Sequence, residues 1–283
     1  MSNLENFESK ERGAEVLFPS HEEAYALAID DRLPIKNVLI GMTKPFSTYK
    51  VHRRTGAKYY LLEYVLEGEG VFQANGKTQK LTAGDLYFID KGEPHDFRSD
   101  EKNPLKKIWI SFDSDYFGEL LKGYRITTGV YRAKVKNYFL SLYNVAAIEA
   151  SPQDKFFTIA ENLHAVALQL ARRVVEADKE NADAIKNELL TSVYTKKTLD
   201  EIAAALFMSK SNLIRTFKRR TGMTPYHFLM GEKIKIAQNL LSTTSMQVKN
   251  IAELLSFTDE HYFSFLFKQK TGLTPTEYRC SFS

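Results

Sequence analysis

One short stretch of sequence occurs twice in the last third of the chain. Phe217–Pro225 reads FKRRTGMTP and returns 50 residues later as Phe267–Pro275, FKQKTGLTP. Upstream of each copy lies a second match, Ile202-Ala203 and Ile251-Ala252, at an offset of 49 residues. A repeat of this period indicates one supersecondary unit that is used twice. Because both copies must fold alike, this repeat constrains the architecture more than any other feature.

Each copy carries the local signals of a helix-turn-helix. Thr198 and Glu201 have the spacing of a capping box, so we expect a helix to begin there. Ser209 can cap a second helix, and Gly222 can end it because glycine tolerates the left-handed conformation. A helix, a short turn, a capped helix and a glycine stop together predict a helix-turn-helix. The second copy would place its helices at residues 248–255 and 259–270.

The outward faces of the two second helices are predicted to bind DNA. Asparagine suits adenine and arginine suits guanine because each can bond two atoms of one base edge, while Lys and Arg further along such a helix hold phosphates. The alternative is that these polar residues only solvate two surface helices, but two tandem copies favour DNA. The candidates are Ser209, Ser211, Asn212, Arg215, Lys218 and Arg219 in the first copy, and Glu260, His261, Ser264, Phe265 and Lys268 in the second.

The stretch from about Leu199 to Arg279 resembles the DNA-binding domain of the AraC/XylS family of bacterial transcription regulators. Two positions depart from the family pattern: Ser256 stands where the family usually has Gly, and Phe265 where it often has Arg. We expect the first to stiffen the turn, and the second to leave the helix reading a thymine methyl or adding little specificity. The resemblance rests on Ile202-Ala203, Ser209, Leu213, Arg215, Phe217-Lys218, Gly222, Pro225, Ala237, Leu240-Leu241, Ile251-Ala252, Phe257, Phe263, Phe267-Lys268, Gly272, Pro275 and Tyr278-Arg279.

The charge of the chain is divided unevenly. Of its 283 residues, those from 184 to 283 hold 14 Lys and Arg against 8 Asp and Glu, whereas residues 1–183 hold 25 against 27. A basic C-terminal part indicates a polyanion partner there. One cysteine, Cys280, fits a reducing compartment, and no apolar stretch is long enough for a membrane span. We expect a cytoplasmic protein with no membrane partner.

The sequence from residue 37 to residue 112 has the chemistry of strands. Its β-branched and aromatic runs are bounded by Gly, Pro and Asn, and Asn75-Gly76 between two of them predicts a hairpin turn. Several short strands at this spacing predict a small antiparallel barrel or sandwich. The expected strands are Val38–Met42, Tyr59–Leu66, Val71–Ala74, Leu86–Asp90 and Ile108–Phe112; Leu17-Phe18-Pro19 is read as a short extended arm.

This half carries a second, looser resemblance. The segments Tyr64–Gly70, Leu81–Asp85, Gly92–His95 and Trp109–Phe112 resemble the cupin-type effector domain found upstream of many AraC-family DNA-binding domains. The fold class expected is therefore α+β, with a cupin-like antiparallel β-barrel followed by helices and then an all-α domain with two helix-turn-helix units.

A metal-dependent cupin enzyme is a weaker alternative. Such enzymes need several imidazole and carboxylate ligands. Here the barrel holds His95, with His52 before its first long strand, and Glu67 and Glu69 stand where histidines would be expected. We therefore expect no catalytic residue, no metal and no cofactor.

The barrel mouth can still bind a small molecule. Sugar-sensing members of the family line it with an Arg before the first long strand, a His and an aromatic residue in the loop after Gly-Glu, and a Trp on a late strand. Three alternatives stay open: Trp109 as a core residue, Arg53 as a surface residue beside Arg54, and Lys107 as an exposed strand lysine. The resemblance thus implies an effector site of Arg53, His95, Phe97, Lys107 and Trp109.

Helical spacing follows the barrel at residues 131–147 and 156–176. The family resemblance implies that these helices form the interface of a homodimer. The alternative is that they pack on their own barrel, and a helix that is apolar on more than one face can do both. Residues 178–183 read as a linker, so the predicted domains are 1–183 and 184–283. We expect a DNA-binding regulator that responds to a small sugar and, as the family resemblance implies, mostly activates transcription with RNA polymerase. The alternatives are a constitutive DNA binder whose barrel only dimerises, and a cupin enzyme with a DNA-binding tail.

Overall fold

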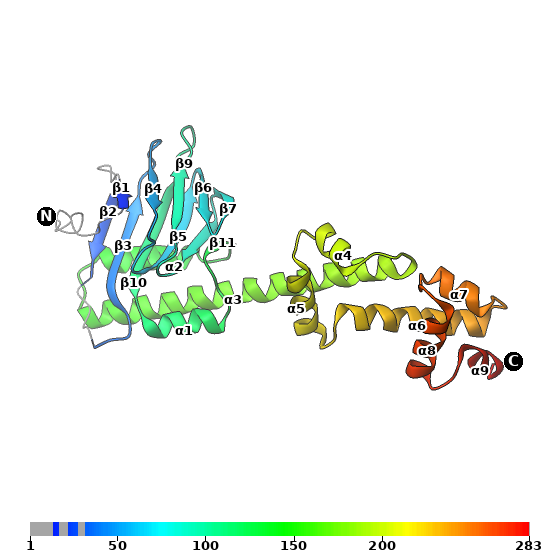
Figure 1. Ribbon diagram of the computed structural model, residues 1–283. Coiled ribbons are helices and arrows are strands. Elements are labelled where there is room, and N and C mark those ends of the chain that lie inside the picture. Colours follow the sequence, from blue (N-terminus) through cyan, green and yellow to red (C-terminus); the bar gives the residue numbers. More distant parts are fainter. Residues whose placement is uncertain (1–13, 17–21, 28–31, 283) are drawn as a thin grey trace. The chain divides into compact units, whose positions relative to one another are not determined.

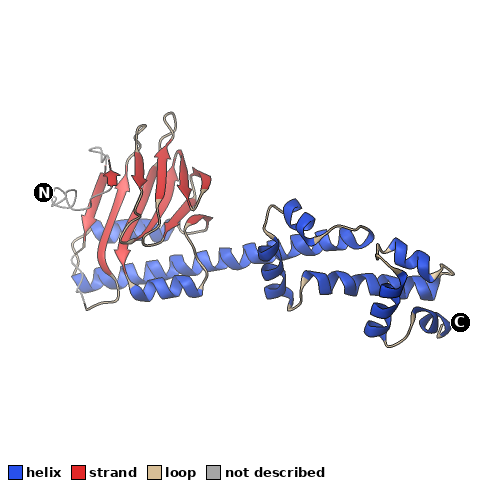
Figure 2. Cartoon of the chain, viewed as in Figure 1, coloured by secondary structure: helices blue, strands red, loops and turns tan. Residues whose placement is uncertain are grey.

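A computed structural model describes residues 14–16, 22–27 and 32–282 (Figure 1; Figure 2). The chain divides into two compact units, Met1–Val174 and Val175–Ser283. The expected arm at residues 17–19 lies outside the described residues.

The N-terminal unit contains two antiparallel sheets, which confirms the predicted β-domain. In the described residues one sheet has the strand order β1-β4-β9-β6-β7 and the other β11-β8-β5-β10-β3-β2. The strands are β1 (Ala14–Val16), β2 (Glu22–Ala26), β3 (Lys36–Thr43), β4 (Lys50–Arg53), β5 (Tyr60–Glu67), β6 (Glu69–Ala74), β7 (Lys77–Thr82), β8 (Asp85–Ile89), β9 (His95–Ser99), β10 (Lys106–Asp113) and β11 (Gly129–Arg132).

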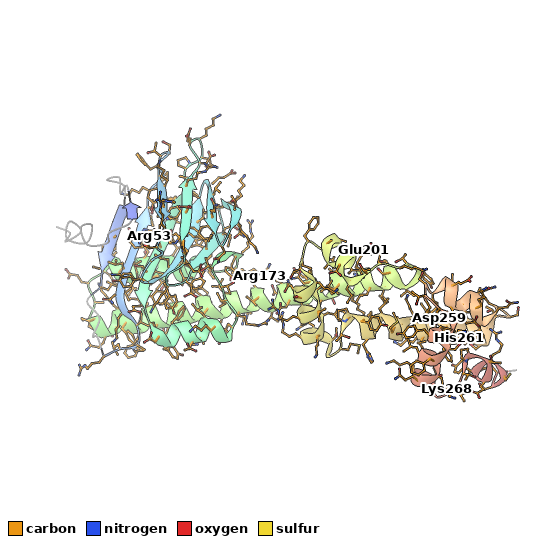
Figure 3. The ribbon with its side chains drawn as sticks, viewed as in Figure 1. Arg53, Arg173, Glu201, Asp259, His261 and Lys268 are labelled. Carbon is orange, nitrogen blue, oxygen red and sulfur yellow. The ribbon has the colours of Figure 1, made fainter. Side chains whose placement is uncertain are left out.

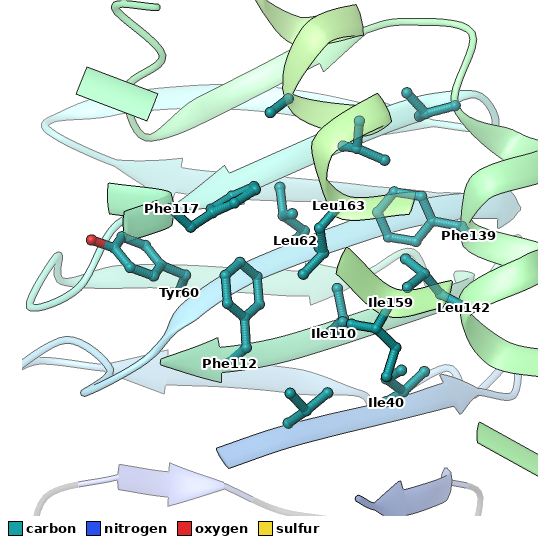
Figure 4. Packing of buried hydrophobic residues seen from close by; sticks show 14 of the residues in the cluster. Ile40, Tyr60, Leu62, Ile110, Phe112, Phe117, Phe139, Leu142, Ile159 and Leu163 are labelled. Atoms are coloured by element: carbon teal, nitrogen blue, oxygen red, sulfur yellow. The ribbon is translucent and has the colours of Figure 1, made fainter. Parts of the chain in front are cut away.

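Two layers of side chains follow from the alternation along the strands. On β10, Ile108, Ile110 and Phe112 are fully buried and face the helices, whereas Lys107 and Trp109 face the other sheet. The helical layer is made by α1 (Asp115–Gly123), α2 (Lys136–Ala147) and the N-terminal part of α3 (Pro152–Thr191). Figure 4 shows the resulting core, formed by Ile40, Leu62, Ile110, Phe112, Phe117, Phe139, Leu142, Ile159 and Leu163 among others.

Turn chemistry explains which strand predictions succeeded. The Asn75-Gly76 hairpin is present between β6 and β7, and both residues have the positive φ values, 52° and 69°, that a type I′ turn requires.

The helix predicted from residue 131 instead begins at Lys136, because Tyr131 belongs to β11 and pairs with Leu86 of β8. Apolar aromatic residues suit both structures, so the helical spacing alone extended that prediction too far.

The predicted linker at residues 178–183 is helical and forms part of α3. The segment contains no Gly or Pro, and its Ala182 is buried, so neither backbone nor solvation interrupts the helix. The boundary between the two compact units falls after Val174, within the same helix. The domain boundary expected at 183/184 is therefore not marked by a break in secondary structure.

The C-terminal unit consists of short helices around one apolar core. Ile185 and Leu189 of α3 pack in this core with Phe217 and Phe267, one from each sequence repeat. After the turn η2 (Ser192–Tyr194), the helices are α4 (Leu199–Ala205), α5 (Lys210–Thr221), α6 (Pro225–Thr243), α7 (Val248–Leu254), α8 (Glu260–Thr271) and α9 (Pro275–Cys280).

The turns of the two helix-turn-helix units adopt the same strained conformation. Phe207 and Ser256, which are 49 residues apart, have φ values of 53° and 52°. This is the left-handed region that glycine adopts most readily. Both turns therefore keep the backbone of a glycine turn without a glycine.

Candidate functional site

Capping and glycine stops fix the two helices that carry the predicted DNA-binding residues. Ser209 caps α5 by accepting a hydrogen bond from the Asn212 amide at 3.2 Å, and Asp259 caps α8 by accepting from the amides of His261 and Tyr262. These amide hydrogen bonds hold the pKa of Asp259 below its ordinary value. Gly222 and Gly272 end the helices with φ values of 77° and 85°, so the two helices have matching ends.

The first helix, α5, presents a basic outer face. Ser211, Arg215, Lys218 and Arg219 are exposed, and Asn212 is half-buried. The Arg215 guanidinium donates to the Asn212 side-chain oxygen at 3.2 Å, so these two candidate base contacts orient each other. The Ser209 hydroxyl accepts one hydrogen bond in the cap, and its proton can still be donated to DNA.

One of the candidate phosphate contacts already has an anionic partner. Arg219 donates to the carboxylate of Asp178 on α3 at 2.5 Å, and Asp178 lies in the segment that had been read as a linker. The side chain of Asp178 is only 16% exposed, so this carboxylate is held against the guanidinium rather than in water. A DNA phosphate would compete with Asp178 for Arg219.

The second helix, α8, presents a less basic face. Glu260, His261, Phe265 and Lys268 are exposed and Ser264 is half-buried; Figure 3 labels Asp259, His261 and Lys268 on the ribbon. The 64% exposure of Phe265 contrasts with complete burial of Phe263 and Phe267 on either side.

The five predicted effector residues lie on strands, with side chains directed between the two sheets. Arg53 of β4 is the register partner of His95 of β9, and Phe97 lies two residues further along β9. His95 and Phe97 had been expected in a loop; the structure corrects this, because β9 begins at His95. Lys107 and Trp109 come from β10 in the facing sheet.

Lys107 forms a buried ion pair with Glu63 of β5, a residue that no sequence motif indicated. The side chains are 1% and 6% exposed, and the hydroxyl of Tyr87 donates to the same Glu63 oxygen at 2.5 Å. The ammonium nitrogen lies 3.8 Å from the centre of the Phe97 ring and 5.0 Å from that of Tyr49. This environment excludes the alternative that Lys107 is an exposed strand lysine. The ion pair and the two ring contacts give Lys107 a structural role.

His95 is held as a neutral hydrogen-bond acceptor. It is 3% exposed, and burial lowers the pKa of its imidazole, so the ring is uncharged at neutral pH. Its Nδ1 lies 2.9 Å from the backbone carbonyl of Glu93, which can only accept, so Nδ1 carries the proton. The other nitrogen, Nε2, is buried, has no hydrogen-bond partner among the described residues and offers a lone pair.

Trp109 offers the opposite polarity. It is half-buried and lies opposite Glu63 on one side and Gly41 on the other. Its indole Nε1 is buried, and the part of the chain that the structure describes offers it no hydrogen-bond partner. A Cβ at Gly41 would lie 2.5 Å from the Trp109 ring, so the indole lies directly over that glycine. Unlike Ile108 and Ile110, Trp109 is therefore not part of the core between sheet and helices.

Metal ligation finds no support among the described residues, where no group of three or more His, Cys, Asp or Glu side chains is placed to hold a metal ion. His52, the other histidine considered, is exposed on the outside of β4 and pairs with Asp96. No helix in the described part of the chain is sufficiently long and apolar to span a membrane.

A β-domain that buries a few polar side chains among the apolar residues between its sheets, followed by two matched helix-turn-helix units, defines a two-part DNA-binding regulator. Comparison with known proteins identifies the family. The AraC-like ligand binding domain matches residues 39–192, more than half of the chain, and a helix-turn-helix domain matches residues 202–281. The chain belongs to the AraC/XylS family and is a DNA-binding transcription regulator.

Several known proteins are similar to this chain. The raffinose operon transcriptional regulatory protein RafR of Pediococcus pentosaceus is 28% identical over 237 residues, 78% of this chain and 85% of that protein. The lactose operon transcription activator of Staphylococcus xylosus is 23% identical over 267 residues, 90% and 94% of the two chains. Among solved structures, the C-terminal domain of the response regulator yesN from Fusobacterium nucleatum is 31% identical and covers 34% of this chain and 95% of that chain, with a TM-score of 0.34.

Proposed function

We propose that this regulator activates carbohydrate-utilisation genes in response to a small sugar bound between its two sheets. The observation that carries the proposal is that two buried polar atoms, His95 Nε2 and Trp109 Nε1, have no hydrogen-bond partner within residues 14–16, 22–27 and 32–282. A buried polar group without a hydrogen-bond partner costs roughly 1–3 kcal/mol of stability. Such groups therefore usually form a hydrogen bond with the protein, with water or with a ligand. The operons named for the relatives, raffinose and lactose, support a sugar as that partner.

The chemistry of the two atoms supports a hydroxyl-bearing effector. His95 requires a donor and Trp109 requires an acceptor. A sugar hydroxyl provides both, and the flat face of an indole packs on a sugar ring. Arg53, which pairs in register with His95, can donate to a further oxygen, and Phe97 contributes apolar wall. Lys107 acts through its pair with Glu63, shaping this interior.

A thermal-shift screen of the full-length protein against mono- and oligosaccharides tests the effector proposal. Ligand at about 100 times its dissociation constant should stabilise the domain that binds it by about 2.7 kcal/mol. Trp109→Phe removes the indole N–H but keeps an aromatic face, and should weaken the hit about two- to tenfold. A flat screen with folded protein would instead favour the constitutive alternative, in which the barrel only dimerises.

Sequence recognition is assigned to the exposed faces of α5 and α8. Arg215 and Asn212 are proposed to read base edges, and Lys218, Arg219 and Lys268 to hold phosphates. Arg215→Ala should weaken specific binding by about 1–3 kcal/mol and relax preference at one base pair. An equal loss on all sequences, measured by competition with random duplex, would make Arg215 a phosphate contact.

Large apolar side chains are exposed on the helices that follow the strands of the N-terminal unit. On α3 and beside it, Phe157, Leu168 and Ile148 are large apolar side chains that are 61%, 42% and 56% exposed. A second copy of the chain that packs there would make a homodimer; Phe157→Glu should then shift the sedimentation of the protein to that of a monomer. We further propose a cytoplasmic regulator that works with RNA polymerase and is not an enzyme.

A further inference from the structure

We propose that α8 reads thymine through its 5-methyl group, and that the contacting side chain is Phe265. This inference rests on the DNA-reading role proposed for α8, and it resolves what the helix does without the arginine usual at that position.

The repeat makes Phe265 the counterpart of Arg215. The helices α5 and α8 are each 12 residues long and offset by 50 positions, so Arg215 and Phe265 are each the sixth residue of their helix. Each helix is preceded by a side-chain cap and followed by a glycine in the left-handed conformation. Matched backbones therefore present position six in the same direction relative to their own helix-turn-helix, and DNA meets it at the same point in the groove.

The burial pattern confirms that the two helices have the same register. Leu213 and Phe217 of α5 are fully buried, as are Phe263 and Phe267 of α8 at the corresponding positions. Phe265 is 64% exposed, so its ring belongs to the outward face and does not serve the core. An apolar ring at position six, where α5 carries the candidate base contact Arg215, needs an apolar partner.

Charge points to the same partner. The helix α5 carries five Lys and Arg residues, whereas α8 carries two lysines near its end and Glu260 at its start. The Phe265 ring has no donor at position six, so it cannot bond guanine as Arg215 can. Of the groups that base pairs present in the major groove, the thymine methyl is the apolar one, and aromatic side chains contact it.

Replacement of thymine by deoxyuridine tests this directly, because it removes only the methyl group. The full-length protein would first be used to select a binding site from a randomised duplex library, and each dT of the selected site would then be changed to dU. Burying one methyl against the ring corresponds to roughly fourfold in Kd. We expect one or two positions, about one helical turn from the bases that α5 reads, where dU weakens binding by that factor.

Variants assign the methyl contact to a residue. Phe265→Ala should lose the sensitivity to dU, whereas Phe207→Ala, which removes another exposed phenylalanine from the same unit, should keep it. Phe265→Arg should change the preferred base at that position from thymine to guanine in a repeated selection. Because Phe265 lies outside the core, its variants should unfold at the temperature of the wild type.

Three outcomes would overturn the inference: no position sensitive to dU, equal sensitivity in wild type and Phe265→Ala, or loss of the sensitivity in Phe207→Ala as well. A protein that selects no sequence at all would instead overturn the proposed function. The two failures are thus distinguished by whether the library is enriched.

Discussion

The buried pair of Lys107 and Glu63 allows a worked prediction about the N-terminal unit. Replacing Lys107 by Met keeps the length of the side chain and removes the ammonium, so the Glu63 carboxylate stays buried with Tyr87 as its remaining donor. Breaking a buried pair from one side typically costs 3–5 kcal/mol, because an uncompensated charge is left in the interior. For a unit of this size, that corresponds to a fall in Tm of roughly 6–20 °C.

Removing the charge of the other partner, Glu63, should destabilise the unit less. In Glu63→Gln the amide oxygen can still accept from Lys107 and Tyr87, and the ammonium still faces the Phe97 ring at 3.8 Å. A desolvated cation–π contact is worth about 2 kcal/mol, so we expect a loss of about 1–3 kcal/mol. The double variant Lys107→Met/Glu63→Leu removes both charges and should recover most of the stability of the wild type.

Urea unfolding followed by tryptophan fluorescence measures these changes in the relevant unit, because the single tryptophan, Trp109, lies opposite Glu63. Lys106→Met is the matched control: its ammonium pairs with Glu67 at 3.1 Å, but the Glu67 side chain is 68% exposed. Such a pair contributes about 0–1 kcal/mol. If Lys107→Met were no more destabilising than Lys106→Met, Lys107 would not be held by Glu63 and would again be a candidate for direct effector contact.

Three further predictions concern other parts of the chain. Phe207→Gly should raise the free energy of unfolding of the C-terminal unit by about 0.5–1 kcal/mol in urea titrations, because it relieves a φ of 53° at a side chain that is 99% exposed; Phe207→Ala, which keeps the strain, should not. Asp178→Asn should tighten DNA binding up to about fivefold in a fluorescence-anisotropy titration by freeing Arg219, whereas Asn at the exposed Asp183 should not. Burial lowers the pKa of folded His95, so the unfolded state binds more protons than the folded state just below pH 6.5. The free energy of unfolding should therefore fall as the pH drops through that value and level off below the folded pKa. In calorimetric pH profiles, His95→Gln should remove this component.

The helix-turn-helix units were predictable from the sequence because their signals are local. Thr198 with Glu201 forms the expected capping box, Ser209 caps α5, and Gly222 ends it in the left-handed conformation. Each of these signals depends on residues within four positions of one another. Because the sequence is repeated, the same pattern occurs in both units. The length of α3 was not predictable in the same way: its charged middle is compatible with a linker, and the helix continues there because Ala182 and Ile185 are buried by tertiary packing.

The strands of the candidate effector site were only partly visible in the sequence. Val38–Met42 and Ile108–Phe112 are apolar on both faces and lie in β3 and β10. The polar strands β4, β7 and β9 have few such residues, so no run marked them, although β4 and β9 carry Arg53, His95 and Phe97. Sequence resemblance supplied those three residues, and only the pairing of β4 with β9 brings Arg53 opposite His95.

The interior also shows why residue identity alone did not assign roles. Glu63 lies in a strand whose two faces are both apolar, so nothing in the run YLLEYVLE indicates which face it occupies. Its pairing with Lys107, 44 residues away, depends on the register of β5 with β10. Once that pair is satisfied, an acceptor on His95 and a donor on Trp109 are the buried side-chain atoms left without partners in the described residues of the N-terminal unit. A ligand that fits must therefore both donate and accept, which an apolar effector cannot do and a hydroxyl group can.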